Sequence, residues 1–116
     1  MERRSEPRIR AQAPVVVTPL AAVNKRLEGA VVEVSTHGVR VHFGEQLKEL
    51  PRSGEVYRLQ STDDLMLCEV RHAEITGSGA EMGFQIVHWS ISGQLKKLVQ
   101  RAVSLPAAGL GSPARA

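Results

Sequence analysis

The sequence predicts one all-β domain, an antiparallel barrel or sandwich, followed by a single helix. Six short apolar segments follow one another with turn residues between them, a spacing typical of strands joined by hairpins. Only one later segment has helical periodicity. The length of 116 residues suits one domain, and 42% hydrophobic with 23% charged residues is a globular composition rather than a disordered one.

In the first two expected strands, a proline and the alternation of side chains predict the position in the sheet and the residues that face the core. Because Pro19 interrupts the first strand, we expect that strand at the edge of the sheet. In the second strand, alternation turns Val31 and Glu33 outward. Val32 and Val34 then point into the core. In chain order, the expected strands are residues 14–23, 29–34, 39–43, 55–61, 65–75 and 81–88.

Turn residues separate these strands. The segment Ser35-Thr36-His37-Gly38 ends the second strand, with Gly38 available for a positive φ. Gly77-Ser78-Gly79 joins the last two strands. The third strand is the clearest of the six, because its side chains from Val39 to Phe43 alternate between apolar and polar.

The helix is expected over about residues 91–104, where one apolar stripe runs along the segment. Ser90 or Ser92 is expected to cap its start. The domain proper is expected at 13–104, between a flexible basic N-terminal arm at 1–12 and a disordered tail at 105–116. The stripe consists of Ile91, Leu95, Leu98, Val99, Ala102 and Val103.

Charge and rare residue types exclude several classes of protein. Lys and Arg outnumber Asp and Glu by 15 to 12, and four of the arginines lie within residues 1–10. Two Phe, one Tyr and one Trp are too few for a platform that stacks on long nucleic acids. The single cysteine, Cys68, excludes an internal disulfide or zinc ribbon and suits a reducing cytoplasm. No apolar run approaches the roughly 20 residues of a membrane helix, so we expect a cytoplasmic protein without membrane insertion.

No residue pattern is typical of catalysis or of metal binding, so we expect neither an enzyme nor a metal site nor a cofactor. The four histidines lack metal-ligand spacing on a helix. His72 and Glu74, on a strand, simply share one face. Gly77-x-Gly79 followed by Gly83 lies in a hairpin rather than a βαβ unit, so we interpret it as a turn and not as a dinucleotide-binding motif.

Two short motifs stand out from this background. Arg4-Ser5-Glu6-Pro7-Arg8 places two guanidinium groups four residues apart, and Glu33-Val34-Ser35-Thr36-His37-Gly38 places an acid, a hydroxyl and a glycine at a strand end and turn. Together they resemble the Arg-x-x-x-Arg and Asp/Asn-x-Ser-x-x-Gly motifs of the PilZ domain family. The segment Met82-Gly83-Phe84-Gln85-Ile86 and the apolar helix also resemble family features, so the similarity covers about residues 2–103.

This resemblance implies a six-stranded antiparallel β-barrel that binds cyclic di-GMP, a bacterial second messenger. In the family, the arginine pair folds over the ligand and the second motif meets a guanine base. Arg4 and Arg8 correspond to the pair, and Ser35 and Gly38 to the second motif. Glu33 stands where the family has Asp or Asn. Further residues that could contact the ligand are Arg3, His37 and Arg40.

The chemistry of these side chains suits such a ligand. An arginine fork can bind phosphate or the O6 and N7 atoms of guanine, and a carboxylate can accept from guanine N1–H. We therefore expect a receptor whose arm closes over cyclic di-GMP and changes its contacts with a downstream protein. One alternative is an adaptor of the same fold that binds no nucleotide. Another is a small RNA- or DNA-binding barrel, which the gathering of basic residues in the arm disfavours.

Overall fold

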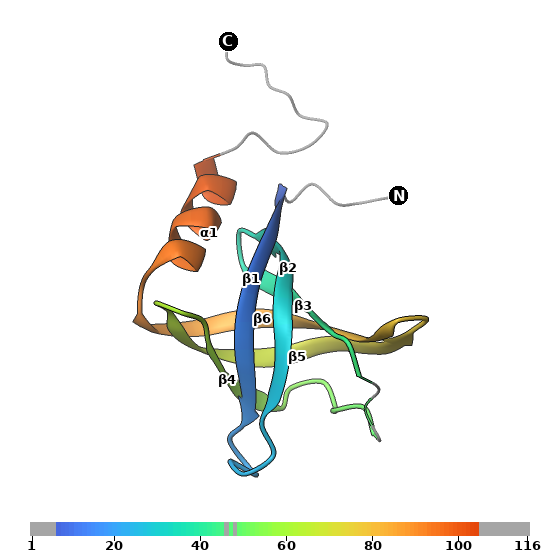
Figure 1. Cartoon of the computed structure of the whole chain (residues 1–116). Helices are drawn as coiled ribbons and strands as arrows, with labels where there is room; N and C mark the ends of the chain where they lie inside the picture. Colours follow the sequence, from blue (N-terminus) through green and yellow to red (C-terminus); the bar gives the residue numbers. More distant parts are fainter. Residues whose placement is uncertain (1–6, 46, 48, 105–116) are drawn as a thin grey trace.

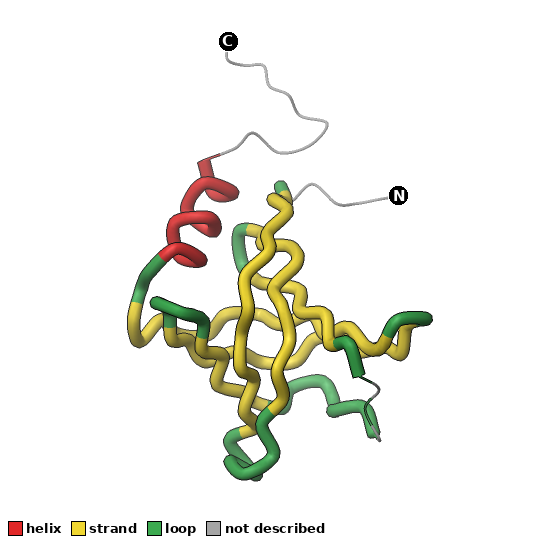
Figure 2. Tube along the Cα trace, in the orientation of Figure 1, coloured by secondary structure: helices red, strands yellow, loops and turns green. Residues whose placement is uncertain are grey.

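Six antiparallel strands close into a barrel, with one helix packed against two of them (Figures 1 and 2). The computed structural model describes residues 7–45, 47 and 49–104. Around the barrel the order is β1-β2-β3-β6-β5-β4, and the pairing of β4 with β1 closes it. The all-β class with one C-terminal helix is confirmed, as is the six-stranded barrel. The elements are β1 (Arg8–Pro19), β2 (Leu27–Ser35), β3 (Gly38–Phe43), β4 (Val56–Gln60), β5 (Leu65–Thr76), β6 (Gly79–Ile91) and α1 (Gln94–Ser104).

Alternate side chains of the strands fill the barrel. In β3, Val39, Val41 and Phe43 are buried, whereas Arg40 is exposed, as the sequence alternation predicts. Fully burying a large apolar side chain contributes about 1.5–3 kcal/mol, so this interior holds the barrel together. The largest fully buried side chains come from all six strands and the helix, and the biggest of them are Phe43, Leu59, Met66, Met82 and Leu95.

β1 begins at Arg8, well before the expected start. Arg8 lies opposite Ser35 of β2, and the residues after it continue this pairing. The predicted arm at 1–12 is therefore wrong for residues 8–12, which belong to the barrel. Residues 1–6 and the expected tail at 105–116 lie outside the described residues. The pairing has a physical reason, because alternate apolar side chains at the start of β1 pack against the core: Ile9, Ala11 and Ala13.

Pro19 marks the end of β1 rather than the edge of a sheet. Because the barrel is closed, β1 pairs with β2 on one side and with β4 on the other. The expected edge strand is thus wrong. A proline at the last position of a strand costs the ladder little, since its missing N–H falls where the pairing ends.

A bulge in β2 overturns the strict alternation expected there. The pairing of β2 with β3 skips Val32, an extra residue between Val31 and Glu33. An extra residue exchanges the faces of the side chains on either side of it. Val31 and Val34 are therefore both buried, and Val32 is only half-buried. The expectation that Val31 points outward and Val32 inward is wrong, whereas the inward position of Val34 is confirmed.

Gly38 is needed for space and not for a left-handed backbone. Among the described glycines, positive φ values occur at Gly54 and Gly79, so the positive φ expected at Gly38 is wrong. A Cβ atom at Gly38 would lie only 2.2 Å from the backbone oxygen of Phe84 in β6. The glycine therefore allows β3 to approach β6 closely at the start of their pairing.

The helix begins three residues later than expected. Ile91 is the last residue of β6, opposite Leu65, and it is exposed, as is Val103. These two ends of the predicted stripe therefore do not enter the core. The middle of the stripe does, and Figure 1 shows α1 beside the barrel. Its buried residues are Leu95, Val99 and Ala102.

The cap of α1 comes from the loop between β4 and β5. Asp64, which is only 2% exposed, accepts hydrogen bonds from the backbone amides of Gly93, Leu95 and Lys96. Its neighbour Asp63 accepts from the amide of Gln94. These two carboxylates satisfy the amides that a helix start leaves without partners. The expectation that Ser90 or Ser92 caps the helix is wrong.

The described part of the chain contains no helix with the length and apolar character needed to cross a bilayer. Within the same residues, no three His, Cys, Asp or Glu side chains gather as the ligands of a metal ion would.

Candidate functional site

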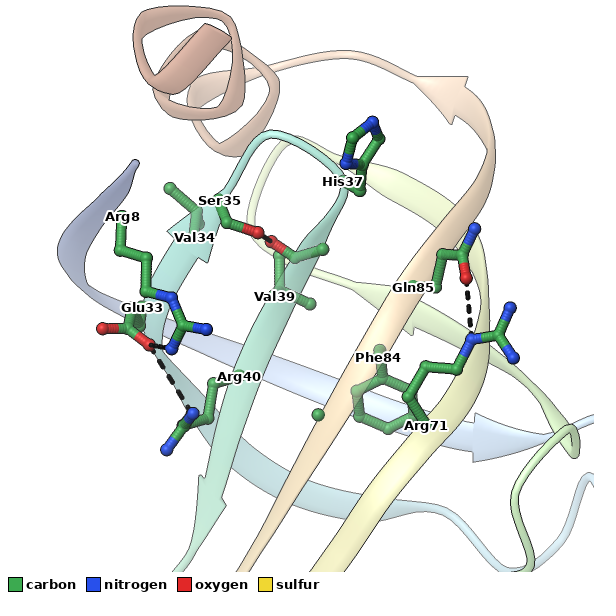
Figure 3. A pocket seen from close by; sticks show the side chains of 12 residues that line it. Arg8, Glu33, Val34, Ser35, His37, Val39, Arg40, Arg71, Phe84 and Gln85 are labelled. Carbon is green, nitrogen blue, oxygen red and sulfur yellow. Dashed lines mark hydrogen bonds and ion pairs between the residues drawn. The ribbon is translucent and has the colours of Figure 1, made fainter. Parts of the chain in front are cut away.

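A surface depression of about 470 Å³ surrounds the turn between β2 and β3 (Figure 3). Its lining comes from β1, β2, β3, β5 and β6, so the barrel brings together residues from position 8 to position 85. The volume lies within the usual range of small-molecule sites, about 300–1,000 Å³. The depression is the candidate site, and its polar side chains form three groups.

The first group is Glu33 with two arginines. One carboxylate oxygen, Oε1, lies 3.4 Å from Nη1 of Arg8 and 3.6 Å from Nε of Arg40. The strand register explains the contacts, since Glu33 lies opposite Arg40 on β3 and two residues from the partner of Arg8 on β2. The three side chains are 29–44% exposed, so each ion pair contributes at most about 1 kcal/mol and can open when a ligand competes for it.

The second group is the turn that carries the Ser-x-x-Gly motif. The hydroxyl of Ser35 donates to the backbone oxygen of Gly38 at 3.5 Å, a long hydrogen bond that a better acceptor can replace. The carbonyl of His37 accepts from the amide of Ile86 at 2.8 Å, which ties the turn to β6. The depression thus has a fixed backbone beside an adaptable hydroxyl.

The third group, Arg71 and Gln85, was missed in the sequence. Nε of Arg71 donates to Oε1 of Gln85 at 2.7 Å, and its Nη2 lies 3.5 Å from Oε1 of Glu69. In Figure 3 this pair lies across the depression from Arg8, Glu33 and Arg40. Neither residue belongs to a recognisable motif. The only sequence signal is Gln85 directly after Gly83-Phe84, within the segment that resembles a late family strand.

The lining is cationic. It contains three arginines and one carboxylate, which leaves a net charge of +2 when the histidine is neutral. Two further carboxylates border the arginines without lining the depression. Oε1 of Glu81 lies 3.6 Å from Nη1 of Arg40, and Oε1 of Glu69 lies 3.5 Å from Nη2 of Arg71. The positive charge therefore lies on the lining itself, where it attracts anions, while the two bordering carboxylates partly balance it from outside the depression.

The structure brings most of the predicted site residues together. Arg8, Glu33, Ser35 and Gly38 all line the depression. The secondary candidates His37 and Arg40 line it as well. Arg3 and Arg4 lie outside the described residues, so their part in the site stays a prediction.

The closed barrel, its C-terminal helix and the cationic depression define a class of small β-barrel domains with a polar surface site. The chain belongs to the PilZ domain family, whose model matches residues 2–104. The resemblance seen in the two sequence motifs is thereby confirmed. PilZ domains act as receptors or adaptors rather than as enzymes. No curated protein sequence matches the chain significantly.

Two solved structures share the fold. The Bacillus subtilis inhibitor of motility, MotI/DgrA, matches 89% of this chain with a TM-score of 0.62 and 18% identity. The chain corresponds to only 51% of that protein, about half its length. The PilZ domain of CeSA from a cellulose-synthesizing bacterium matches 83% of this chain and 92% of its own, with a TM-score of 0.50 and 16% identity. At these identities the likeness shows the fold alone.

Proposed function

We propose that this PilZ domain is a non-enzymatic receptor for cyclic di-GMP, which it binds in the depression. The observation that carries the proposal is that Arg8, Ser35 and Gly38, from both family motifs, line one cationic depression. Cyclic di-GMP has two phosphates and therefore two negative charges. The net charge of +2 on the lining complements it.

Each motif residue has a role that its position supports. Arg8 is exposed, and within the described part of the chain it makes a weak ion pair with Glu33, from which it turns to a phosphate or a guanine edge. The hydroxyl of Ser35 exchanges its long bond to Gly38 for one to the ligand. Glu33 accepts from guanine N1–H and keeps Arg8 and Arg40 near the ligand. Arg4, with Arg3 beside it, completes the arginine pair.

The readout we propose is a change of protein contacts. Because β1 begins at Arg8, the segment that closes over the ligand is the one that precedes this residue. α1 packs against β1 and β2, the strands that carry Arg8 and Glu33. A downstream protein that binds beside these two strands would therefore contact both the helix and the segment that closes over the ligand. The lone buried Cys68 fits a cytoplasmic setting.

Calorimetric titration with cyclic di-GMP, with GTP as control, tests the proposal. Arg8→Ala removes a charge-assisted contact worth about 1.5–3 kcal/mol, so binding weakens about tenfold or more. Arg4→Ala has the same effect. The matched control is Arg58→Ala, because Arg58 is an exposed arginine of β4 outside the depression. If the parent protein does not bind cyclic di-GMP, the proposal is wrong, and an adaptor of the same fold that binds no nucleotide becomes the favoured alternative.

A further inference from the structure

Gly83 leaves a stretch of bare backbone between two arginines of the depression. In the strand register, Gly83 of β6 lies opposite Arg40 of β3 on one side and opposite His72 of β5 on the other. Its neighbours along β6, Met82 and Phe84, are buried, so position 83 faces outward. A Cβ atom there would meet nothing closer than the Cβ of His72, at 3.7 Å. The space above Gly83 is therefore open.

Arg71 stands on the far side of this space because of a bulge. Val70 pairs with Phe84 and His72 with Gly83, so Arg71 is the extra residue of β5. A bulge of this kind changes the direction of a side chain, and here Arg71 lines the depression. Neighbouring strands lie about 4.8 Å apart, so β6 separates Arg40 from Arg71 by about 10 Å between strand axes.

Gln85 holds Arg71 in place before any ligand arrives. Glu69 and Gln85 are partners across β5 and β6, and both contact the guanidinium of Arg71, at 3.5 and 2.7 Å. A long side chain that is already held loses less freedom when it binds a ligand. Arg71 and Gln85 both line the depression and are hydrogen-bonded to each other, so this wall is polar and its two side chains are already paired.

We propose that Arg40, Gly83 and Arg71 form a second subsite, which binds the second guanosine unit of cyclic di-GMP. The inference rests on the function proposed above, in which Arg8 and Ser35 take the first unit. A flat purine fits over backbone that carries no side chain, and glycine in a strand is typical of such close approach. Arg71 then donates its fork to O6 and N7 of this guanine, and Arg40 neutralises the phosphate between the units. The subsite makes the protein select a dinucleotide over a mononucleotide.

The test compares Arg71→Ala and Gly83→Val with Arg58→Ala in calorimetric titrations with cyclic di-GMP. GMP, which binds more weakly, is followed by amide chemical shifts in NMR spectra. We expect both subsite variants to bind cyclic di-GMP about tenfold more weakly or worse, while their affinity for GMP changes less than about twofold. Arg71→Lys, which lacks the fork, is expected to fall between Arg71→Ala and the parent. Arg58→Ala is expected to behave like the parent.

Three outcomes are decisive. If the parent binds cyclic di-GMP and Arg71→Ala binds it equally well, the subsite does not exist, although the proposed function stands. If the parent binds no cyclic di-GMP, both proposals fail together. If circular dichroism shows that Gly83→Val is unfolded, the test of the subsite rests on Arg71→Ala alone. The side chain of Arg71 is 53% exposed and contributes little to folding, so this variant is expected to fold.

Discussion

Removing the carboxylate of Asp64 is expected to loosen α1 from the barrel. This buried group accepts hydrogen bonds from the amides of Leu95 at 3.0 Å and Lys96 at 3.3 Å, and from the amide of Gly93. It also accepts from the hydroxyl of Ser61 at 2.8 Å. One side chain therefore joins the loop between β4 and β5 to the first turn of the helix.

The magnitude follows from these contacts. Loss of a helix N-cap costs about 0.5–2 kcal/mol, and donors left unsatisfied in a buried place cost about 1–3 kcal/mol more. Because the bonds share one acceptor and are not additive, we expect Asp64→Ala to lower the free energy of unfolding by about 3 kcal/mol. Asp64→Asn keeps one acceptor oxygen, so it is expected to cost about 1 kcal/mol.

The same contacts make stability depend on pH. Burial alone would raise the pKa of Asp64, but the hydrogen bonds from Leu95 and Ser61, with those from Gly93 and Lys96, lower it below its ordinary value. A carboxylate with a lowered pKa in the folded state stabilises the fold above the unfolded pKa of about 4. This contribution is lost as the pH falls through the folded pKa, so the difference between the parent and Asp64→Asn shrinks below about pH 4.

Urea and thermal unfolding followed by circular dichroism measure both effects. A loss of 3 kcal/mol corresponds to a fall in Tm on the order of 10 °C. Asp63→Asn is the matched control, since Asp63 is exposed and accepts from Gln94 alone. The reasoning is refuted if Asp64→Ala melts within a few degrees of the parent, or if the difference between the parent and Asp64→Asn is the same at pH 3 as at pH 7.

Three further experiments test the site and the core. Gly38→Ala forces a Cβ atom against the backbone oxygen of Phe84, so we expect urea unfolding to show a loss of stability of about 1–3 kcal/mol. Gly83→Ala has room for its Cβ atom, so its stability is expected to stay within about 1 kcal/mol of the parent. Equal stability of the two variants would contradict the steric argument. In titrations at fixed salt, Glu33→Ala is expected to bind cyclic di-GMP more weakly than the parent, and Glu33→Asp at least as tightly. Tighter binding by Glu33→Ala would show that the carboxylate competes with the ligand for the arginines. Burial raises the pKa of the Cys68 thiol to about 12, so iodoacetamide at pH 8 is expected to label it only in urea, and rapid labelling of the folded protein would disprove this burial.

Much of the barrel can be predicted because its strands carry local signals. The alternation from Val39 to Phe43 and the glycines of the last hairpin locate strands and turns without any tertiary information. The motif residues Arg8, Ser35 and Gly38 were found through the resemblance of two motifs to those of the PilZ family, and the barrel brings them to one depression. These features depend on neighbours in the sequence or on a resemblance that spans the chain.

The features of β2, β5 and α1 that the sequence analysis missed have a common physical cause, because the structure at each of these places is set by a residue or strand far away in the sequence. Val32 becomes the extra residue of β2 only through the register with β3. Arg71 reaches the depression only through a bulge opposite β6. The cap of α1 lies about thirty positions earlier in the chain, at Asp64, so the nearby serines were the natural local choice. Periodicity within one segment cannot locate such features.

The structure also separates the motif residues that support the fold from those that contribute little to it. Gly38 is required by the approach of β3 to β6, so its presence is expected in this barrel whether or not a nucleotide binds. Arg8 is different, because among the described residues its exposed guanidinium makes one ion pair, with Glu33, which contributes at most about 1 kcal/mol. The fold gains little from an arginine there, whereas a phosphate or a guanine edge would use its full hydrogen-bonding fork. Of the two, Arg8 is therefore the residue whose substitution distinguishes a nucleotide receptor from an adaptor with the same barrel.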